Sequence, residues 1–591
     1  MSPPMTRVAA LLLACLPLAV AGQSASAPDT PSSLLLRQIA DEYSKQRPSA
    51  DSQLTDVSES RARLEADTAR SILKRLDPVQ PAELTHDEWL TLGILKSRLD
   101  QVIKEQDVYW FLSPVTAQSN VFLRSHRVLE RHPFHASGDL DGYRARLAEY
   151  PAFIGRIEAK LAGQAERGVV LPEEAIGPIV ASLTQYVRDP AKSPFAVAAS
   201  RLAKIDRDAA AEFQKDVART IVSDLNPALT RLAEFLDGPL RAKAPKTVGL
   251  WQYPGGKDAY RLLIRAETTL DVSPEEAHKI GLREVAALER RLTDIRTRLD
   301  FKGSKEDFHR FLKTDPRFFP KTPEEIGNKL TSAIDRIRPA LDRFFTTFPK
   351  APYTIKRLNP ALEGSMTYGY YTVPSPLDPS GYYFFNGSNL DQRSLLNAAA
   401  LAYHEIMPGH HFHMAGQRER LERPAFRRNL GHSGFQEGWA EYASSGLAME
   451  AGMYSDPYDL YGRLMYDTFF SVRLVVDTGL NFYGWPRAKA IAYMKEHTLE
   501  SDTQIDSETL RYAVGSPAQA LSYKLGSLKM FELRRKAERA LGKRFDIKKF
   551  HEALVGSGSM PLTLLEEHID WFIAQEKSGP ALAEPGRGVP R

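Results

Sequence analysis

The chain has 591 residues, of which 43% are hydrophobic and 26% are charged, and its formal net charge is +4. This length predicts more than one structural unit, and the composition is typical of a globular protein. Basic and acidic residues are interspersed, which excludes the one-sided basic surface of nucleic-acid-binding proteins, so we expect no nucleic-acid partner.

The N-terminal segment, residues 1–21, has the features of a secretory signal peptide. Arg7 precedes an apolar run of about fourteen residues, which closes on the small residues Ala19 and Ala21. The run is too short for a comfortable membrane-spanning helix, and no later stretch approaches that length. We therefore expect an exported protein, periplasmic or secreted, with no integral membrane segment in the mature chain.

Cys15, the only cysteine, leaves a second interpretation of this segment open. Residues 12–15 also resemble a bacterial lipoprotein processing site, which would make the mature chain lipid-anchored. The apolar run continues past Cys15, and this favours cleavage after Ala21. The mature protein would then contain no disulfide and no catalytic thiol.

Most of the sequence up to residue 350 is predicted to be helical. In segments such as 60–76 and 209–236, apolar residues recur at three- and four-residue spacing between charged ones. Two helix starts are clear, because Ser273 and Thr322 each precede a proline and lie three residues before a glutamate. We expect these helices to be scaffold.

A different pattern follows between residues 352 and 386. Three segments rich in aromatic and β-branched residues are separated by Pro, Gly, Asp and Ser, which predicts a small sheet of three strands. These segments are residues 353–358, 366–373 and 381–386. The many tyrosines indicate either a packed sheet face or a cleft wall whose edge strand pairs with an extended peptide. A helix is predicted next, over residues 392–407.

The end of that helix carries His404, Glu405, His410 and His411. A zinc hydrolase needs two imidazoles on one metal and a carboxylate that takes a proton from water. The usual helical arrangement, H-E-x-x-H, places both histidines on one face. Here Pro408 occupies the position of the second histidine.

His410 is the preferred second ligand, and His411 remains the alternative. On an ideal helix His411 lies about 10.5 Å along the axis from His404, too far for easy chelation. Pro408 cannot donate a helical hydrogen bond, and Gly409 tolerates unusual dihedral angles. We expect a bulge or widened turn that absorbs two extra residues and returns His410 to the ligand position.

A second pair of acidic residues begins 33 residues after His404. Glu437 and Glu441 have i, i+4 spacing and share one helix face. We assign Glu437 as the third zinc ligand and Glu441 as the carboxylate that orients a ligand histidine. Each motif alone is weak evidence for a zinc site, but the two motifs in this order along the chain make a specific combination.

These segments resemble DUF885, a bacterial family of unknown function related to the gluzincin metallopeptidases and, more distantly, to thermostable carboxypeptidases of the HExxH type. The resemblance covers most of the mature chain and rests on residues 255–281, 404–411, 437–440, 516–526 and 550–562. It implies a mainly α-helical peptidase fold with a small β-sheet beside the active-site helix and one zinc ion. It also supports His410, because the His-Glu-x-x-Pro-Gly-His pattern is family-like.

The C-terminal part of the resemblance supplies candidates for stabilising negative charge on a carbonyl oxygen. Tyr523 is the preferred hydrogen-bond donor. Arg511 and Tyr512, with His411 and Glu441, are expected either to support the ligands or to contact substrate.

The predicted function is zinc-dependent hydrolysis of peptide bonds, with Glu405 as general base and short peptides as substrates. Two alternatives remain: an exported protein that binds peptides without cleaving them, and a zinc hydrolase acting on other amides or esters. The sequence leaves the oligomeric state open. Its predicted parts are a signal peptide (1–21), an N-terminal helical region (22–240), a helical scaffold (241–350), a catalytic region (351–576) and a disordered tail (577–591).

Overall fold

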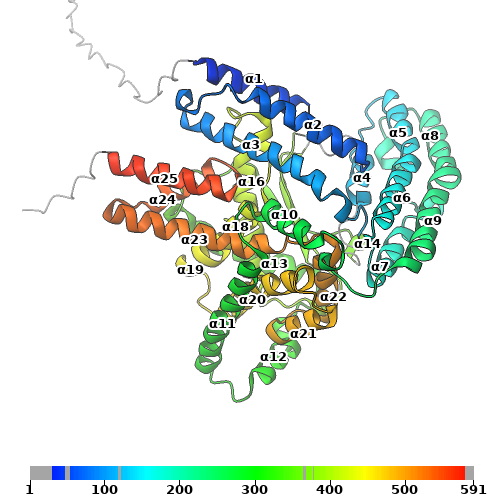
Figure 1. Ribbon diagram of the computed structural model, residues 1–591. Helices are drawn as coiled ribbons and strands as arrows, with labels where there is room; N and C mark the ends of the chain where they lie inside the picture. The colour runs from blue at the N-terminus through cyan, green and yellow to red at the C-terminus, as the bar shows by residue number, and fades with distance from the viewer. Residues whose placement is uncertain (1–28, 47–53, 117–120, 364–367, 377, 580–591) are drawn as a thin grey trace, which may run out of the picture.

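The computed structural model describes residues 29–46, 54–116, 121–363, 368–376 and 378–579. The predicted fold class is confirmed, because the protein is mainly helical with one small sheet (Figure 1). The predicted signal peptide, and all but the first three residues of the predicted tail, lie outside the described residues. Within the described ranges, no helix combines the length and the apolar character needed to cross a membrane.

Three N-terminal helices lie over the C-terminal part of the chain. They are α1 (Pro31–Lys45), α2 (Glu59–Arg75) and α3 (His86–Asp107). Thr85 starts α3 with a capping box, in which its side chain and that of Glu88 satisfy each other's backbone N–H groups. The apolar face of α3 packs in the same core as α25 (Leu562–Ser578), so an N-terminal helix contacts the last helix of the fold.

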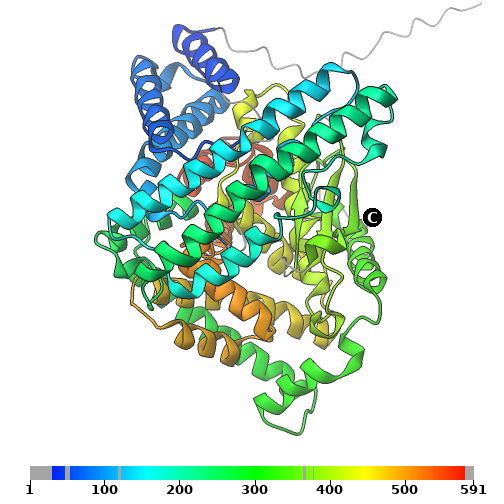
Figure 2. The ribbon, with the colours of Figure 1, turned by 90° about the vertical axis from the view of Figure 1, so that its right-hand side faces the viewer.

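The next six helices form a separate group with a hydrophobic core of its own (Figures 1 and 2). Phe153, Ile157 and Leu229 are among its fully buried residues. The group consists of α4 (Val121–Glu130), α5 (Gly138–Ala148), α6 (Tyr150–Glu166), α7 (Glu173–Thr184), α8 (Arg207–Thr220) and α9 (Asn226–Phe235). A single π-helical turn, Ile221–Leu225, joins α8 to α9.

The scaffold helices that follow are α10 (Gly256–Thr268), α11 (Pro274–Arg298), α12 (Lys305–Thr314) and α13 (Pro323–Ile337). Ser273 caps α11 with the predicted capping box. The equivalent prediction for Thr322 is half wrong: α13 starts at Pro323, but the Thr322 side chain caps no backbone N–H. The Glu325 carboxylate instead accepts a hydrogen bond from the Lys321 N–H at 2.6 Å.

The predicted three-stranded sheet is confirmed. Its strands are β1 (Tyr353–Arg357), β2 (Gly369–Thr372) and β3 (Gly381–Phe385), and α14 (Pro360–Glu363) lies between the first two. Strand β3 is central; it pairs in parallel with β1 and antiparallel with β2, with Tyr371 opposite Tyr383. Alternation along β3 buries Tyr383 and Phe385 against the helices. The strand order leaves β1 and β2 as the two edges of the sheet.

The remaining helices include those that build the site. They are α15 (Ala398–Glu405), α16 (His410–Arg418), α17 (Ala425–Asn429), α18 (Ser433–Tyr442), α19 (Ala448–Glu450), α20 (Pro457–Asn481), α21 (Arg487–His497), α22 (Asp502–Leu510), α23 (Leu521–Leu541), α24 (Ile547–Gly556) and α25. Helix α20 is buried on all sides from Tyr461 to Asn481, except at the partly buried Asp467, as expected of a core helix. It packs against α11, α15 and α23 and so holds the centre of the molecule.

Candidate metal centre

His404 and Glu405 form the last turn of α15, and His410 is the first residue of α16. The helix predicted over residues 392–407 is shorter than expected, because it starts at Ala398 and ends at Glu405. The predicted bulge or widened turn takes the form of a complete break over residues 406–409. Ile406 leaves the helical region with φ −119° and ψ −82°. The break turns the chain so that His404 and His410 face each other, with ring centroids 4.7 Å apart.

Gly409 explains why the chain can turn so tightly here. A Cβ atom at this position would lie 1.8 Å from the carbonyl oxygen of His404, so any other residue would clash with backbone. Pro408, which follows a cis peptide bond, has no N–H to continue the ladder of α15. The two residues that interrupt the H-E-x-x-H pattern thus create the turn that brings His410 to the site.

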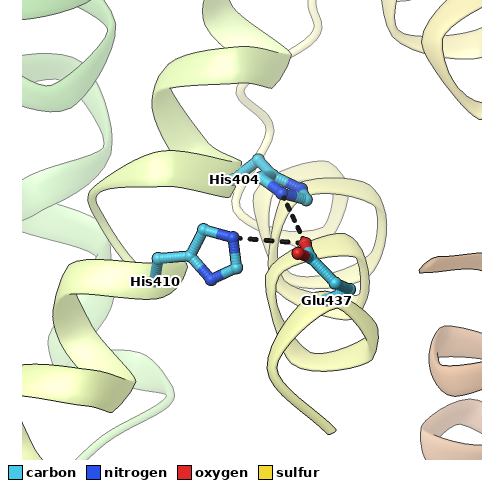
Figure 3. Close-up of side chains that lie close together, drawn as sticks. All are labelled: His404, His410 and Glu437. Carbon is cyan, nitrogen blue, oxygen red and sulfur yellow. Dashed lines mark ion pairs between the residues drawn. The ribbon is translucent and has the colours of Figure 1, made fainter. Parts of the chain in front are cut away.

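Glu437, on α18, completes a group of three candidate metal ligands (Figure 3). Its Oε2 lies 3.4 Å from Nε2 of His404 and 3.3 Å from Nε2 of His410. One potential ligand atom from each residue lies within 4.8 Å of the others. Two imidazole nitrogens and a carboxylate oxygen are the donor set of many catalytic zinc sites.

Glu441 lies one turn further along α18 and holds His404 from behind. Its Oε1 lies 2.8 Å from Nδ1 of His404, so Nε2 is directed at Glu437. Its Oε2 accepts a 2.7 Å hydrogen bond from Arg463, which also donates to Ser444. Burial alone would raise the pKa of Glu441, but Arg463 and His404 lower it below its usual value.

The electrostatics of the three residues fit a cation. Burial opposes charge on His404, yet its contacts with Glu437 and Glu441 raise its pKa to about 10. Burial likewise opposes ionisation of Glu437, but His410 and His404 hold the pKa of its carboxyl well below the usual range. Within the described chain, Oε2 of Glu437 and Nδ1 of His410 are buried without a hydrogen-bond partner. A metal ion would satisfy the first of these atoms and neutralise the carboxylates.

Glu405 follows the first histidine and faces the same space from α15. Burial raises the pKa of its carboxyl, and positive charge on His410 and His404 counteracts this shift. A carboxylate whose pKa is moved toward neutrality is suited to accept and return a proton.

These side chains lie in a cleft with a volume of about 450 Å³, within the usual range for ligand sites. Strand β2 forms part of its wall, and helices α15, α16, α18, α20, α22 and α23 supply most of the rest. Its lining includes Tyr370, Tyr371, Gln436, Tyr466, Phe469, Phe470, Arg473, Glu508, Arg511 and Tyr523.

Tyr523 reaches the site from the first turn of α23. Its ring stacks on Phe470 at 4.8 Å and lies parallel to His404 at 6.0 Å between centroids. Helices α18 and α23 approach so closely at Gly438 that a Cβ atom there would lie 2.6 Å from the backbone of Gly526. Burial raises the pKa of Tyr523, so its phenol keeps the proton needed for donation.

The two residues predicted beside Tyr523 have different places. Arg511 lines the cleft and shares the Glu508 carboxylate with Arg473, at 3.0 and 3.1 Å. Tyr512 is fully buried behind them, and its hydroxyl accepts a hydrogen bond from Arg473. The guanidinium of Arg473 lies 4.7 Å from the centroid of the Tyr523 ring.

His411, the alternative ligand, points away from the other two histidines. Its Nδ1 lies 2.8 Å from the Tyr371 hydroxyl and its Nε2 lies 3.1 Å from the Ala351 carbonyl oxygen. A Cβ atom on Gly381 would lie 2.6 Å from the His411 ring, so this glycine lets β3 approach it. In this structure His411 ties α16 to the sheet.

Three charged residues of the site were missed from the sequence: Arg463, Arg473 and Glu508. Arg463 and Arg473 lie in the buried part of α20, and an arginine inside a buried helix is itself a signal of a buried ionic partner. Glu508 has i, i+3 spacing to Arg511, which is weak evidence alone.

The chain belongs to the family described as bacterial protein of unknown function DUF885, whose model matches residues 40–569. This confirms the family resemblance found in the sequence. No curated protein shows significant sequence similarity to the chain.

Two solved structures share the fold. A putative lipoprotein from Colwellia psychrerythraea is 23% identical, with a TM-score of 0.84 over 92% of this chain and 99% of that one. A putative lipoprotein of unknown function from Shewanella oneidensis is 16% identical, with a TM-score of 0.66 over 91% and 98%. A putative oligoendopeptidase F from Bacillus anthracis str. Ames aligns over 89% and 96% at 11% identity, but its TM-score of 0.27 adds nothing to the assignment.

Proposed function

We propose that this protein is an exported zinc-dependent peptidase that cleaves short peptides. The observation that carries the proposal is the convergence of His404, His410 and Glu437 in a cleft that also contains Glu405. These three residues would hold the metal. When bound, zinc would supply a Lewis acid that lowers the pKa of a water and polarises the substrate carbonyl.

The chain's own groups then have distinct tasks. Glu405 accepts a proton from the attacking water and returns it to the leaving amine nitrogen. The Tyr523 phenol donates a hydrogen bond to the carbonyl oxygen as negative charge develops there. Arg473, which shares the Glu508 carboxylate with Arg511, lies against the Tyr523 ring and positions it.

The sheet edge favours a peptide over other amides or esters. Strand β2 is an edge strand, and its residues Gly369, Tyr370 and Tyr371 line the cleft. An extended peptide can add to such an edge through its backbone hydrogen bonds, which places successive residues at regular spacing along the cleft. The aromatic side chains then provide contact area for the substrate.

Export is supported by residues 1–21, whose sequence has the charge, apolar core and cleavage site of a signal peptide. Two proteins of the same fold are described as putative lipoproteins, which agrees with an exported location. Cleavage after Ala21 gives a soluble form, whereas lipid attachment at Cys15 gives an anchored form.

We expect about one zinc ion per chain in the purified mature protein, and almost none in the His404→Ala variant. Loss of His404 removes one ligand and leaves Glu441 and Arg463 without their link to the metal. Inductively coupled plasma mass spectrometry after dialysis measures the metal content, and a peptide library measures cleavage.

The control is His135→Ala, because this exposed histidine lies far from the site in sequence and in the fold. It should keep both metal and activity. Absence of zinc in the wild-type protein, even after incubation with the metal, would contradict the proposal. Zinc binding with peptide binding but no cleavage of any library member would favour a peptide-binding function instead.

Glu441→Gln should weaken zinc affinity by about 10–100-fold, as is typical when the carboxylate behind a ligand histidine is lost. The amide can still contact His404 but no longer supplies the negative charge that raises the basicity of its imidazole. Competition with a fluorescent zinc chelator gives the affinity. Glu538→Gln, which alters a half-exposed ion pair with Arg534, should leave it unchanged. Equal affinities for the two variants would exclude an orienting role for Glu441.

A further inference from the structure

A second pocket opens beside the metal cleft. We call it the side pocket; its volume is about 210 Å³, and it lies between β3, α15, α20 and α22. It shares Tyr368, Leu401, Tyr466 and Ser507 with the lining of the cleft. Its size, below the roughly 300–1,000 Å³ of complete ligand sites, suits one group of a larger bound molecule.

Arg393 brings an unpaired positive charge to the side pocket. Its Nε donates a 2.9 Å hydrogen bond to the Ser388 carbonyl, which leaves the two Nη groups available. No ion pair in the described part of the chain includes Arg393. The neighbouring Glu363 is already paired with Arg357, through contacts of 2.8 and 3.0 Å, so its charge is neutralised.

Tyr383 supplies a second group without a partner. Its side chain is 1% exposed, and its hydroxyl has no hydrogen-bond partner among the described residues. A buried hydroxyl without a partner is costly, and such groups in native proteins call for an explanation. A ligand oxygen in the side pocket would accept a hydrogen bond from the Tyr383 hydroxyl.

The carboxyl of Glu500, which also lines the side pocket, cancels only part of the Arg393 charge. It accepts a 2.5 Å hydrogen bond from the Tyr368 hydroxyl and has no ion-pair partner among the described residues. Burial raises its pKa to about 7, so it carries less negative charge near neutral pH than an exposed glutamate. Arg393 is therefore the dominant charge in the side pocket.

We propose that the side pocket binds a carboxylate of the substrate, held by the Nη groups of Arg393 with a hydrogen bond from the Tyr383 hydroxyl. A guanidinium offers two parallel N–H groups that match the two oxygens of a carboxylate. The inference rests on the proposed peptidase function and names its substrate class. The preferred peptides carry either an acidic side chain or a free C-terminal carboxylate at one position near the cleaved bond.

The test uses alanine-based peptides in which Glu or Gln occupies each position in turn, each made with a free and with an amidated C-terminus. In the zinc-loaded wild-type protein we expect one carboxylate to raise kcat/KM at least about tenfold over its amide, as for a charged hydrogen-bond pair. Preference for Glu identifies a side-chain carboxylate, and preference for the free terminus identifies the C-terminal one. Ratios near one for every pair would overturn the inference while leaving the peptidase function intact.

Three variants separate the side pocket from general damage. Arg393→Gln should abolish the preference for the carboxylate over its amide, and Arg393→Lys should retain part of it. Tyr383→Phe removes a hydroxyl that has no hydrogen-bond partner within the described ranges, so folding should be unaffected while the preference falls several-fold. Arg310→Gln, at a side chain 70% exposed on α12, is the matched control and should behave as wild type. A preference that survives in Arg393→Gln would also overturn the inference.

A binding measurement keeps the inference testable if no peptide is cleaved. Calorimetric titration compares N-acetyl-glutamate amide with N-acetyl-glutamine amide, and N-acetyl-alanine with its amide. We expect at least about tenfold tighter binding of the carboxylate in one pair, and loss of this difference in Arg393→Gln. Equal binding in both pairs would reject the carboxylate site, whatever the enzyme's activity.

Discussion

Glu405→Gln should lower kcat by about 10²–10⁴-fold while zinc content and peptide affinity stay close to those of the wild type. The carboxylate of Glu405 faces the cleft but is not among the three ligand side chains, so its loss removes a proton acceptor without removing a ligand. Glutamine has nearly the same size and cannot accept the proton. Steady-state kinetics on one cleaved peptide, beside mass spectrometric metal analysis, gives both quantities.

Glu496→Gln is the matched control, because the Glu496 side chain is 70% exposed and lies on α21, away from the cleft. It should show wild-type kcat. Substantial turnover by a zinc-loaded Glu405→Gln protein would remove Glu405 from the role of base. Loss of zinc from that variant would instead show that Glu405 takes part in metal binding.

Arg463→Met should reduce the free energy of unfolding by about 3–5 kcal/mol, the range found when one partner of a buried ion pair is removed. The Arg463 side chain is fully buried and donates to both Glu441 and Ser444. Methionine fills much of the same space. However, the buried Glu441 carboxylate then loses one of the groups that stabilise its negative charge. Equilibrium urea unfolding at constant zinc concentration measures the change.

An exposed ion pair provides the comparison. Arg63→Met disrupts the ion pair between Arg63 and Glu59, which are 62% and 34% exposed. It should reduce the free energy of unfolding by no more than about 1 kcal/mol.

The double variant Arg463→Met/Glu441→Gln should be less destabilised than Arg463→Met alone, because it no longer contains the buried Glu441 carboxylate without its arginine partner. A loss below about 1 kcal/mol in Arg463→Met would show that Glu441 is stabilised by other groups.

Local chemistry made several elements predictable. The capping box at Ser273 uses groups only three residues apart, and the three strands follow from aromatic and β-branched runs between turn residues. The shared face of Glu437 and Glu441 follows from the period of a helix. The same local pattern is present at Thr322, but no capping box forms there. The Glu325 carboxylate instead accepts a hydrogen bond from the Lys321 N–H.

The family was also recognisable, because its motifs are short stretches of adjacent residues, and the match over residues 40–569 bears this out. The sequence also singled out His404, Glu405, His410 and Glu437 as one set. It left His411 open, because the shape of a break at Pro408 and Gly409 depends on backbone contacts that spacing does not describe.

Tertiary structure decided how those residues meet. The end of α15 at Glu405 and the close approach of Gly409 to the His404 carbonyl set the direction of His410, while β3 and β2 hold His411 elsewhere. Arg463 supports Glu441 from a helix that the metal-site motifs do not include. Arg393 and Tyr383 reach the side pocket from separate elements. Such contacts join residues far apart in sequence, and their geometry depends on how whole helices pack, so a single sequence shows the chemical groups but not their arrangement.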